Sequence, residues 1–316
     1  MLKAVPVIDL HRLRILRAVA QHGSFSAAAT ALHLSPAAVS QHIAALERAV
    51  GTPVVDRGPR GVRLTAPGQV LVATAEAVAA ELDGARQEVE RLISGNTGRL
   101  AVATFASAGQ RLLPDALSGF LADNPCADVS VIEAEPEVSM PLVRDGGADL
   151  ALVYRFSQRD PDEPGLRLTL LMSEPMFAIL PASHPRAGAA RLTLAELADD
   201  RWFLGTNTTG SALAHQAALS GFTPNVVCRG DDYLFIHAMV GAGVGVALVP
   251  QLGLPDPPDP RVAVVPVAGP GPSRHVYAVA PRAKWTNPLA DDLLARLGAT
   301  AAGCRAVPGL DRKGPR

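Results

Sequence analysis

The feature that most constrains the fold is a pair of short helices joined by a tight turn within the first fifty residues. A helical apolar pattern stops at Gly23, where a left-handed conformation can end a helix. Ser24 then begins a short Ala-rich helix. A third helix, reaching about Val50, starts with Ser35 as N-cap and Pro36 at the first helical position. This pattern predicts a helix-turn-helix, and an ordinary Ala-rich helical hairpin is the alternative.

A helix-turn-helix places the first half of its second helix in the major groove of DNA, so side chains there must be short or hydrogen-bonding. Gln41 can pair with adenine through two hydrogen bonds, and Ser40 can serve several base edges or a phosphate. The segment from Val54 to Thr65 holds two β-like pieces around a turn rich in Gly and Pro. We expect a β-hairpin wing whose arginines contact phosphates or enter a minor groove. The predicted DNA-contacting residues are Ser24, Ser35, Pro36, Ala37, Ser40, Gln41, Arg57, Arg60 and Arg63.

The charge distribution agrees with a DNA-binding head. Residues 1–66 contain eight basic and three acidic residues, a net charge of +5. The remainder holds 21 basic and 27 acidic residues, a net charge of −6. A basic segment on an acidic body is expected of a polyanion-binding module attached to a domain with another task.

These residues closely resemble the LysR-type transcriptional regulators, and the resemblance spans residues 8–300. One departure is that Pro36 stands one place earlier than the family's proline, so the Gln that often reads a base in the family is missing. The resemblance implies a winged helix-turn-helix, a dimer linker helix and an effector-binding domain. The motifs that carry it are Gly23-Ser24-Phe25-Ser26-Ala27-Ala28-Ala29, Ala38-Val39-Ser40 and Arg63-Leu64-Thr65.

The segment from Pro67 to about Ser94 contains no helix stop apart from Gly84, where we expect a bend. Its apolar residues are spaced like the seam of a coiled coil. A helix packed on its own domain could give the same stripe, but about 40 Å of exposed helix with an apolar seam favours dimerisation. The predicted seam consists of Leu71, Val78, Leu82, Ala85, Val89 and Leu92.

Beyond residue 97, expected strands and helices alternate, which predicts parallel sheet covered by helices. The fold class is therefore an N-terminal winged helix-turn-helix, a long linker helix and a C-terminal two-lobed α/β domain resembling type II periplasmic binding proteins. The expected domains are 8–66 (DNA-binding), 67–94 (linker) and 97–300 (effector-binding), with a disordered tail at 301–316. Lobe I would contain 97–165 and 282–300, and lobe II 166–281. We expect strands at 99–104, 128–133, 149–154, 166–170, 176–180, 202–204, 225–228, 244–249 and 275–280, and helices at 110–122, 136–145, 194–198, 211–220, 233–240 and 288–297.

Ligands of open α/β sheets bind outside the carboxyl ends of the strands. Hydroxyls and N–H groups at helix starts in those places suit an acidic or polar metabolite. The family resemblance puts effector contacts at Thr104, Ser107 and Thr206, whereas capping hydroxyls without a ligand are the alternative. The predicted effector-binding residues are Thr104, Ser107, Tyr154, Gly205, Thr206, Asn207 and Asp232.

Other function classes have less support. The sequence has no nucleophile elbow, zinc-protease motif, P-loop or paired metal ligands, so we expect no enzyme, cofactor or metal. Its three cysteines lack disulfide or zinc spacing. A solute-binding receptor would need a signal peptide and would not use a basic head. We expect a cytoplasmic regulator whose partners are double-stranded DNA, a small-molecule effector, a second copy of the chain with dimers pairing into tetramers, and RNA polymerase. The alternative is a ligand-binding protein or enzyme without a DNA role.

Overall fold

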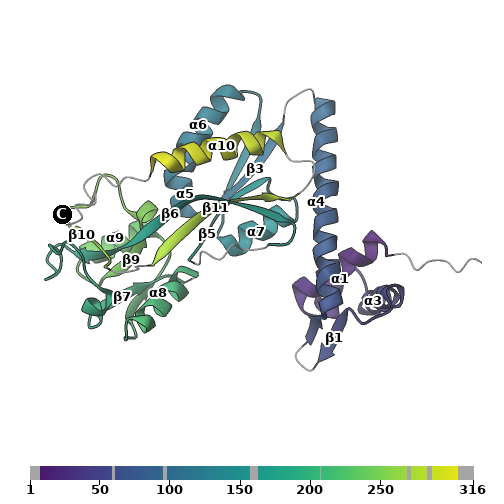
Figure 1. Cartoon of the computed structure of the whole chain (residues 1–316), viewed down its shortest axis with the longest axis horizontal. Coiled ribbons are helices and arrows are strands. Elements are labelled where there is room, and N and C mark those ends of the chain that lie inside the picture. Colours follow the sequence, from purple (N-terminus) through teal and green to yellow (C-terminus); the bar gives the residue numbers. More distant parts are fainter. Residues whose placement is uncertain are drawn as a thin grey trace, which may run out of the picture.

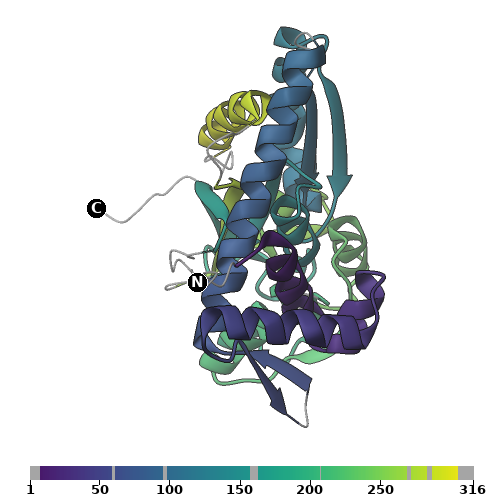
Figure 2. The same cartoon turned by 90° about the vertical axis from the view of Figure 1, so that its right-hand side faces the viewer.

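The computed structural model describes residues 8–58, 61–94, 98–156, 163–206, 208–268, 272–282 and 287–304. A small helical head packs at one end of a long helix, α4 (Ala66–Ser94), and the larger C-terminal domain lies beside that helix (Figures 1 and 2). No helix among these residues has the length and apolarity required to cross a membrane.

The head has the predicted elements, because each boundary is marked by local chemistry. Helix α1 (Leu10–His22) ends at Gly23 in the left-handed region, α2 (Phe25–Ala31) is capped by Ser24, and α3 (Pro36–Val50) is capped by Ser35. Strands β1 (Val55–Gly58) and β2 (Gly61–Leu64) form the antiparallel wing. Fully buried Leu16, Val39 and Ile43 belong to a single core shared by these elements.

Helix α4 confirms the linker helix and corrects one residue of its predicted seam. Leu71 is buried in the core of the head, where it packs with residues of α1 and the wing. The apolar stripe left exposed on α4 includes Val70, Leu82 and Val89. Leu71 therefore anchors the linker to its own head, and the side chain of Leu92 lies outside the described part of the chain.

The first lobe has three layers. Strands β3 (Arg99–Thr104), β4 (Asp128–Glu133) and β5 (Leu150–Arg155) are parallel, with β3 in the middle. Helices α5 (Ala106–Arg111), α6 (Leu113–Asp123) and α10 (Pro288–Gly303) contribute to the core on one face, and α7 (Pro136–Arg144) packs on the other. The expected helix at 110–122 is thus two helices that meet at Leu112. Because α10 continues to Gly303, the prediction of a tail from 301 is wrong for its first residues, and residues 305–316 lie outside the described part.

Two long strands connect the lobes. The sequence predicts separate strands at 166–170 and 176–180, but β6 (Leu166–Pro181) is continuous. Its first part pairs with β11 (Ser273–Pro281), which also pairs with β5, and its last part pairs with β9 (Ala247–Pro250) and β10 (Val262–Pro266). Met172 and Val276 lie in the core of the first lobe. The chain therefore passes from one lobe to the other within β6 and β11, rather than at residues 165 and 281.

The second lobe is completed around the far half of β6. Strands β7 (Arg201–Leu204) and β8 (Asn225–Arg229) are parallel, and helices α8 (Thr208–Leu219) and α9 (Tyr233–Gly241) contribute to its core. Three expectations need correction here. The segment at 194–198 is a 3-10 turn (Leu194–Leu197), the strand expected at 244–249 begins only at Ala247, and β10 was not predicted.

Candidate DNA-binding surface and ligand pocket

The exposed start of α3 is the candidate base-reading surface. Ser35 Oγ accepts the backbone N–H of Ala38 at 3.1 Å, which holds the first turn of the helix. Pro36, Ala37 and Gln41 are exposed, and Ser40 is partly exposed. Ser24 caps α2 in the same way, since its Oγ accepts the N–H of Ala27 at 3.1 Å. Both serine hydroxyls can still donate a hydrogen bond to a phosphate.

The wing is fixed beside this surface by a close backbone contact. The N–H of Val62 donates to the carbonyl oxygen of Gly23 at 2.9 Å. Gly61 has a φ of +109°, and a Cβ there would lie 2.8 Å from that same oxygen, so only glycine fits. Arg63 is exposed on β2. Arg60 and the side chain of Arg57 lie outside the described part of the chain, so their DNA contacts stay predictions.

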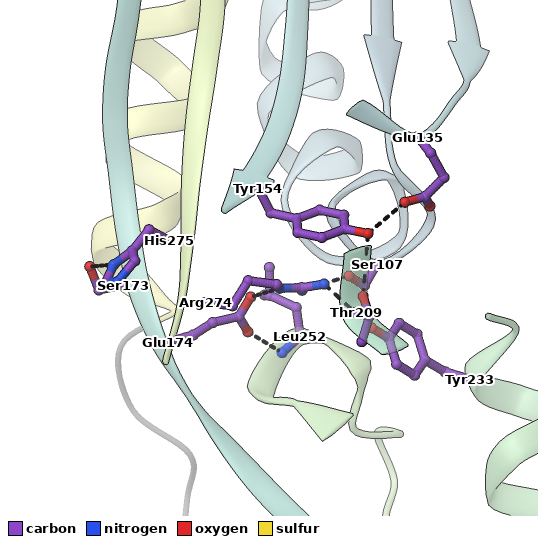
Figure 3. A network of polar contacts seen from close by, with 10 residues as sticks. All are labelled: Ser107, Glu135, Tyr154, Ser173, Glu174, Thr209, Tyr233, Leu252, Arg274 and His275. Carbon is purple, nitrogen blue, oxygen red and sulfur yellow. Dashed lines mark hydrogen bonds and ion pairs between the residues drawn. The ribbon is translucent and has the colours of Figure 1, made fainter. Parts of the chain in front are cut away.

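A cavity of about 30 Å³ lies between the two lobes, next to a buried ion pair. Arg274 of β11 and Glu174 of β6 are directly opposite each other in the strand register. Their side chains are only 1% and 0% exposed, and Arg274 Nε lies 2.6 Å from Glu174 Oε1. The second carboxylate oxygen of Glu174 accepts the N–H of Leu252 at 2.7 Å (Figure 3). The pair joins the two crossing strands where the lobes meet.

The guanidinium group of Arg274 has further partners besides Glu174. Nη2 donates to Ser107 Oγ at 2.8 Å, and Nη1 donates to the hydroxyl of Tyr233 at 3.4 Å. The rings of Phe105 and Tyr154 lie 4.9 and 5.0 Å from its central carbon. Ser107 belongs to α5 of the first lobe, and Tyr233 belongs to α9 of the second lobe. Arg274 therefore has partners in both lobes.

Tyr154 connects the lobes at the other side of the cavity. Its hydroxyl donates to Glu135 Oε2 at 2.7 Å and lies 3.3 Å from Thr209 Oγ1 of α8 (Figure 3). Burial raises the pKa of the Glu135 carboxyl above its ordinary value, and the charge of Asp231 adds to this increase. Burial likewise raises the pKa of the Tyr154 hydroxyl, which therefore remains protonated.

The structure brings only part of the predicted effector set together. Ser107, Tyr154 and Gly205 line the cavity. Thr104 is buried and donates to the carbonyl oxygen of Phe105, and the hydroxyl of Thr206 donates to Asp231. Asp232 caps α9 through the N–H groups of Leu234 and Phe235, and Asn207 lies outside the described residues. Effector contacts of all these residues stay predictions.

Four charged residues at or beside the cavity were missed: Glu135, Glu174, Asp231 and Arg274. A signal for two of them was present. Glu174 and Arg274 each interrupt an otherwise apolar segment expected to be strand, and opposite charges buried in two strands have to pair. Glu135 and Asp231 follow strands at their carboxyl ends, where the sequence favours hydroxyl and N–H groups as ligand contacts.

A winged head on a long helix, followed by two lobes around a cavity, defines a DNA-binding protein with a ligand-binding domain. The family model for "LysR substrate binding domain" matches residues 94–302, and the model for "Bacterial regulatory helix-turn-helix protein, lysR family" matches residues 10–69. The chain belongs to the LysR family of transcriptional regulators, which combine a helix-turn-helix DNA-binding domain with an effector-binding domain. The predicted family and fold class are confirmed.

Individual relatives agree with this assignment. The HTH-type transcriptional regulator IlvR from Caulobacter vibrioides is 31% identical over 77% of this chain and 82% of that protein. The transcriptional dual regulator GltC from Bacillus subtilis is 26% identical over 90% of this chain and 95% of that protein. The crystal structure of full-length CbnR complexed with its target DNA matches with a TM-score of 0.53 and 21% identity, covering 93% of this chain and 100% of that one.

Proposed function

We propose that this regulator acts as a homodimer joined along α4, and that a small molecule bound between the lobes changes how its two heads lie on DNA. The proposed units are 8–66 for DNA binding, 67–94 for dimerisation and 97–300 for effector binding. The observation that supports effector binding between the lobes is the buried network around Arg274 and Tyr154, which includes residues of both lobes. We also propose that the chain acts in the cytosol and by binding alone, without catalysis.

Exposed apolar residues support the assembly. On α4, the side chains of Val70, Val78 and Leu82 line one shallow groove on the surface. Strand β4 pairs with β3 alone among the described strands, and its Val131 and Ile132 are exposed. An unpaired strand edge with apolar side chains can take a second protein chain. Dimerisation through α4 combined with a contact at β4 would give a tetramer, and the DNA-bound form would then meet RNA polymerase.

The experiment that tests DNA binding is a gel shift with the DNA upstream of the gene at several salt concentrations. Gln41→Ala should weaken specific binding by about 1–3 kcal/mol, roughly 5- to 150-fold, because it removes a base contact. Arg63→Ala should weaken binding to every duplex alike and reduce the salt slope by about one, because it removes a phosphate contact. Arg191→Ala, an exposed arginine in the C-terminal domain, is the control. Failure to bind any duplex at low salt would reject the proposal.

Ion pairs that join the head and the linker to α7 support communication between the two functions. Arg17 Nη2 of α1 lies 3.1 Å from Asp145 Oδ1, and Arg144 Nε lies 3.8 Å from Glu76 Oε2 of α4. These contacts are at the C-terminal end of α7. Glu135, which touches Tyr154 at the cavity, is the N-cap residue of the same helix. A displacement of α7 by the ligand would therefore reach the head.

Charge reversal at this contact gives the second prediction. Arg17→Asp and Asp145→Arg should each change the basal output of a reporter promoter about two- to fivefold, since a half-exposed pair is worth ~0.5–1 kcal/mol. The double variant should return toward the original output, because the pair forms again with its charges exchanged. Arg14→Asp, at an exposed position of the same helix, is the control. Additive effects in the double variant would show that this contact transmits nothing.

A further inference from the structure

The electrostatics of the cavity narrow the class of effector, a step that rests on the proposed binding site between the lobes. Arg274 is the only cationic side chain among the described residues that line the cavity. Its charge is balanced by Glu174 at 2.6 Å, and each of its three nitrogens has a partner. The rings of Phe105 and Tyr154 lie next to each other on one side of the guanidinium group, with their centroids 4.9 Å apart. The cavity therefore offers a ligand no uncompensated positive charge.

Two carboxyl groups, one from each lobe, line the same cavity. Glu135 precedes α7 in the first lobe, and Asp231 lies between β8 and α9 in the second. Burial and the charge of Asp231 both raise the pKa of Glu135. Asp231 accepts the backbone N–H of Thr206 at 2.9 Å, which keeps its carboxyl in place. Two like charges already line the cavity, and an anionic ligand would add a third.

The remaining wall is rich in aromatic side chains. Phe105, Tyr154, Phe156, Phe203 and Tyr233 all line the cavity. Aromatic faces attract cations and pack against apolar groups, especially where water is excluded. The cavity of about 30 Å³ has room for little more than water, so a ligand must part the lobes or displace side chains when it enters. A small ligand with one charged end fits these walls best.

We propose that the effector is a small organic cation, a protonated amine on an apolar body, whose ammonium group lies between Glu135 and Asp231. The ammonium group donates hydrogen bonds to both carboxyl groups, and the apolar body packs among the rings. Because the two carboxyl groups belong to different lobes, the cation holds the lobes together. The sequence had suggested an acidic or polar metabolite, and the paired state of Arg274 is the reason for the change.

The test compares three probes of equal size with the full-length protein: benzylamine, benzyl alcohol and benzoate, each at the same millimolar concentration and neutral pH. Benzylamine should raise the Tm, benzyl alcohol should raise it less, and benzoate should not raise it. Glu135→Gln and Asp231→Asn should each weaken benzylamine binding at least tenfold. Both amides keep an acceptor oxygen for Tyr154 or Thr206, so both variants should fold. Glu133→Gln, an exposed carboxyl on β4, is the matched control and should leave the shift unchanged.

Three results would overturn the proposal. They are a benzoate shift as large as the benzylamine shift, a benzylamine shift that is unchanged in both variants, and no change in the Tm with any of the three probes. Any of these results would reject the cationic effector and leave DNA binding in the gel shift intact. Loss of DNA binding at low salt, with the benzylamine shift retained, would instead reject the regulator and keep the cation site.

Discussion

Glu174→Gln should lower the free energy of unfolding of the C-terminal domain by about 3–5 kcal/mol, because it leaves the charge of Arg274 buried without its counter-ion. The two side chains are almost completely excluded from water. A guanidinium group cannot escape the cost by losing its proton, since its pKa is far above neutral and is raised further here by Glu174, although burial acts in the opposite direction. The amide keeps an acceptor for Leu252, so the loss can be assigned to the ion pair.

Urea unfolding followed by circular dichroism measures this loss, and hydrogen exchange in β6 and β11 locates it. Arg274→Met should be destabilising by a similar amount, and the double variant Glu174→Gln/Arg274→Met should lose less than the sum of the two. Asp123→Asn is the control, because it breaks an exposed pair with Arg296 at 2.7 Å and should cost under about 0.5 kcal/mol. A loss below about 1 kcal/mol in Glu174→Gln would mean that water reaches the pair.

The head could be predicted almost completely from the sequence, and the physical reason is local. Gly23 and Gly51 adopt φ of +66° and +79°, and Ser24 and Ser35 accept backbone N–H groups within three residues. Each of these signals is decided by neighbours in the chain, so no knowledge of the tertiary fold is needed. Leu71 is the exception, because its place in the helical pattern is equally consistent with a dimer seam and with the core of the head that it enters.

The lobes could be predicted as alternating elements, but their junction could not. Separate strands are expected at 166–170 and 176–180, and Ser173, Glu174 and Pro175 lie in the gap between them. In the structure this stretch stays extended, because Glu174 faces Arg274 across the strands, 100 residues further along the chain. The same separation along the chain explains which residues of the candidate site could be predicted and which could not. Ser107, Tyr154 and Gly205 follow from rules about strand ends, whereas a charge in the middle of a strand is meaningful only with its partner known.

The second large effect is expected from substitutions on α4 that disrupt the proposed dimer. Leu82→Glu combined with Val89→Glu should convert the proposed dimer to a monomer and lower operator affinity at least about 100-fold, since two linked heads bind two half-sites far more tightly than one head binds one. The side chains of Leu82 and Val89 are 52% and 54% exposed in the single chain. Each contributes about 1.5–3 kcal/mol when it is fully buried in a partner, and a carboxylate in the same place has to lose its water.

Neither position belongs to the core of the head or of the lobes, so the double glutamate variant should keep its fold and its affinity for a single half-site. Leu82→Met and Val89→Ile are the matched controls, because they preserve an apolar seam of similar volume. Light scattering after gel filtration gives the mass, and gel shifts with one and with two half-sites separate the loss of dimerisation from damage to the head. A variant that remains dimeric would move the dimer contact from α4 to another surface, of which the exposed edge of β4 is the first to test by Ile132→Lys.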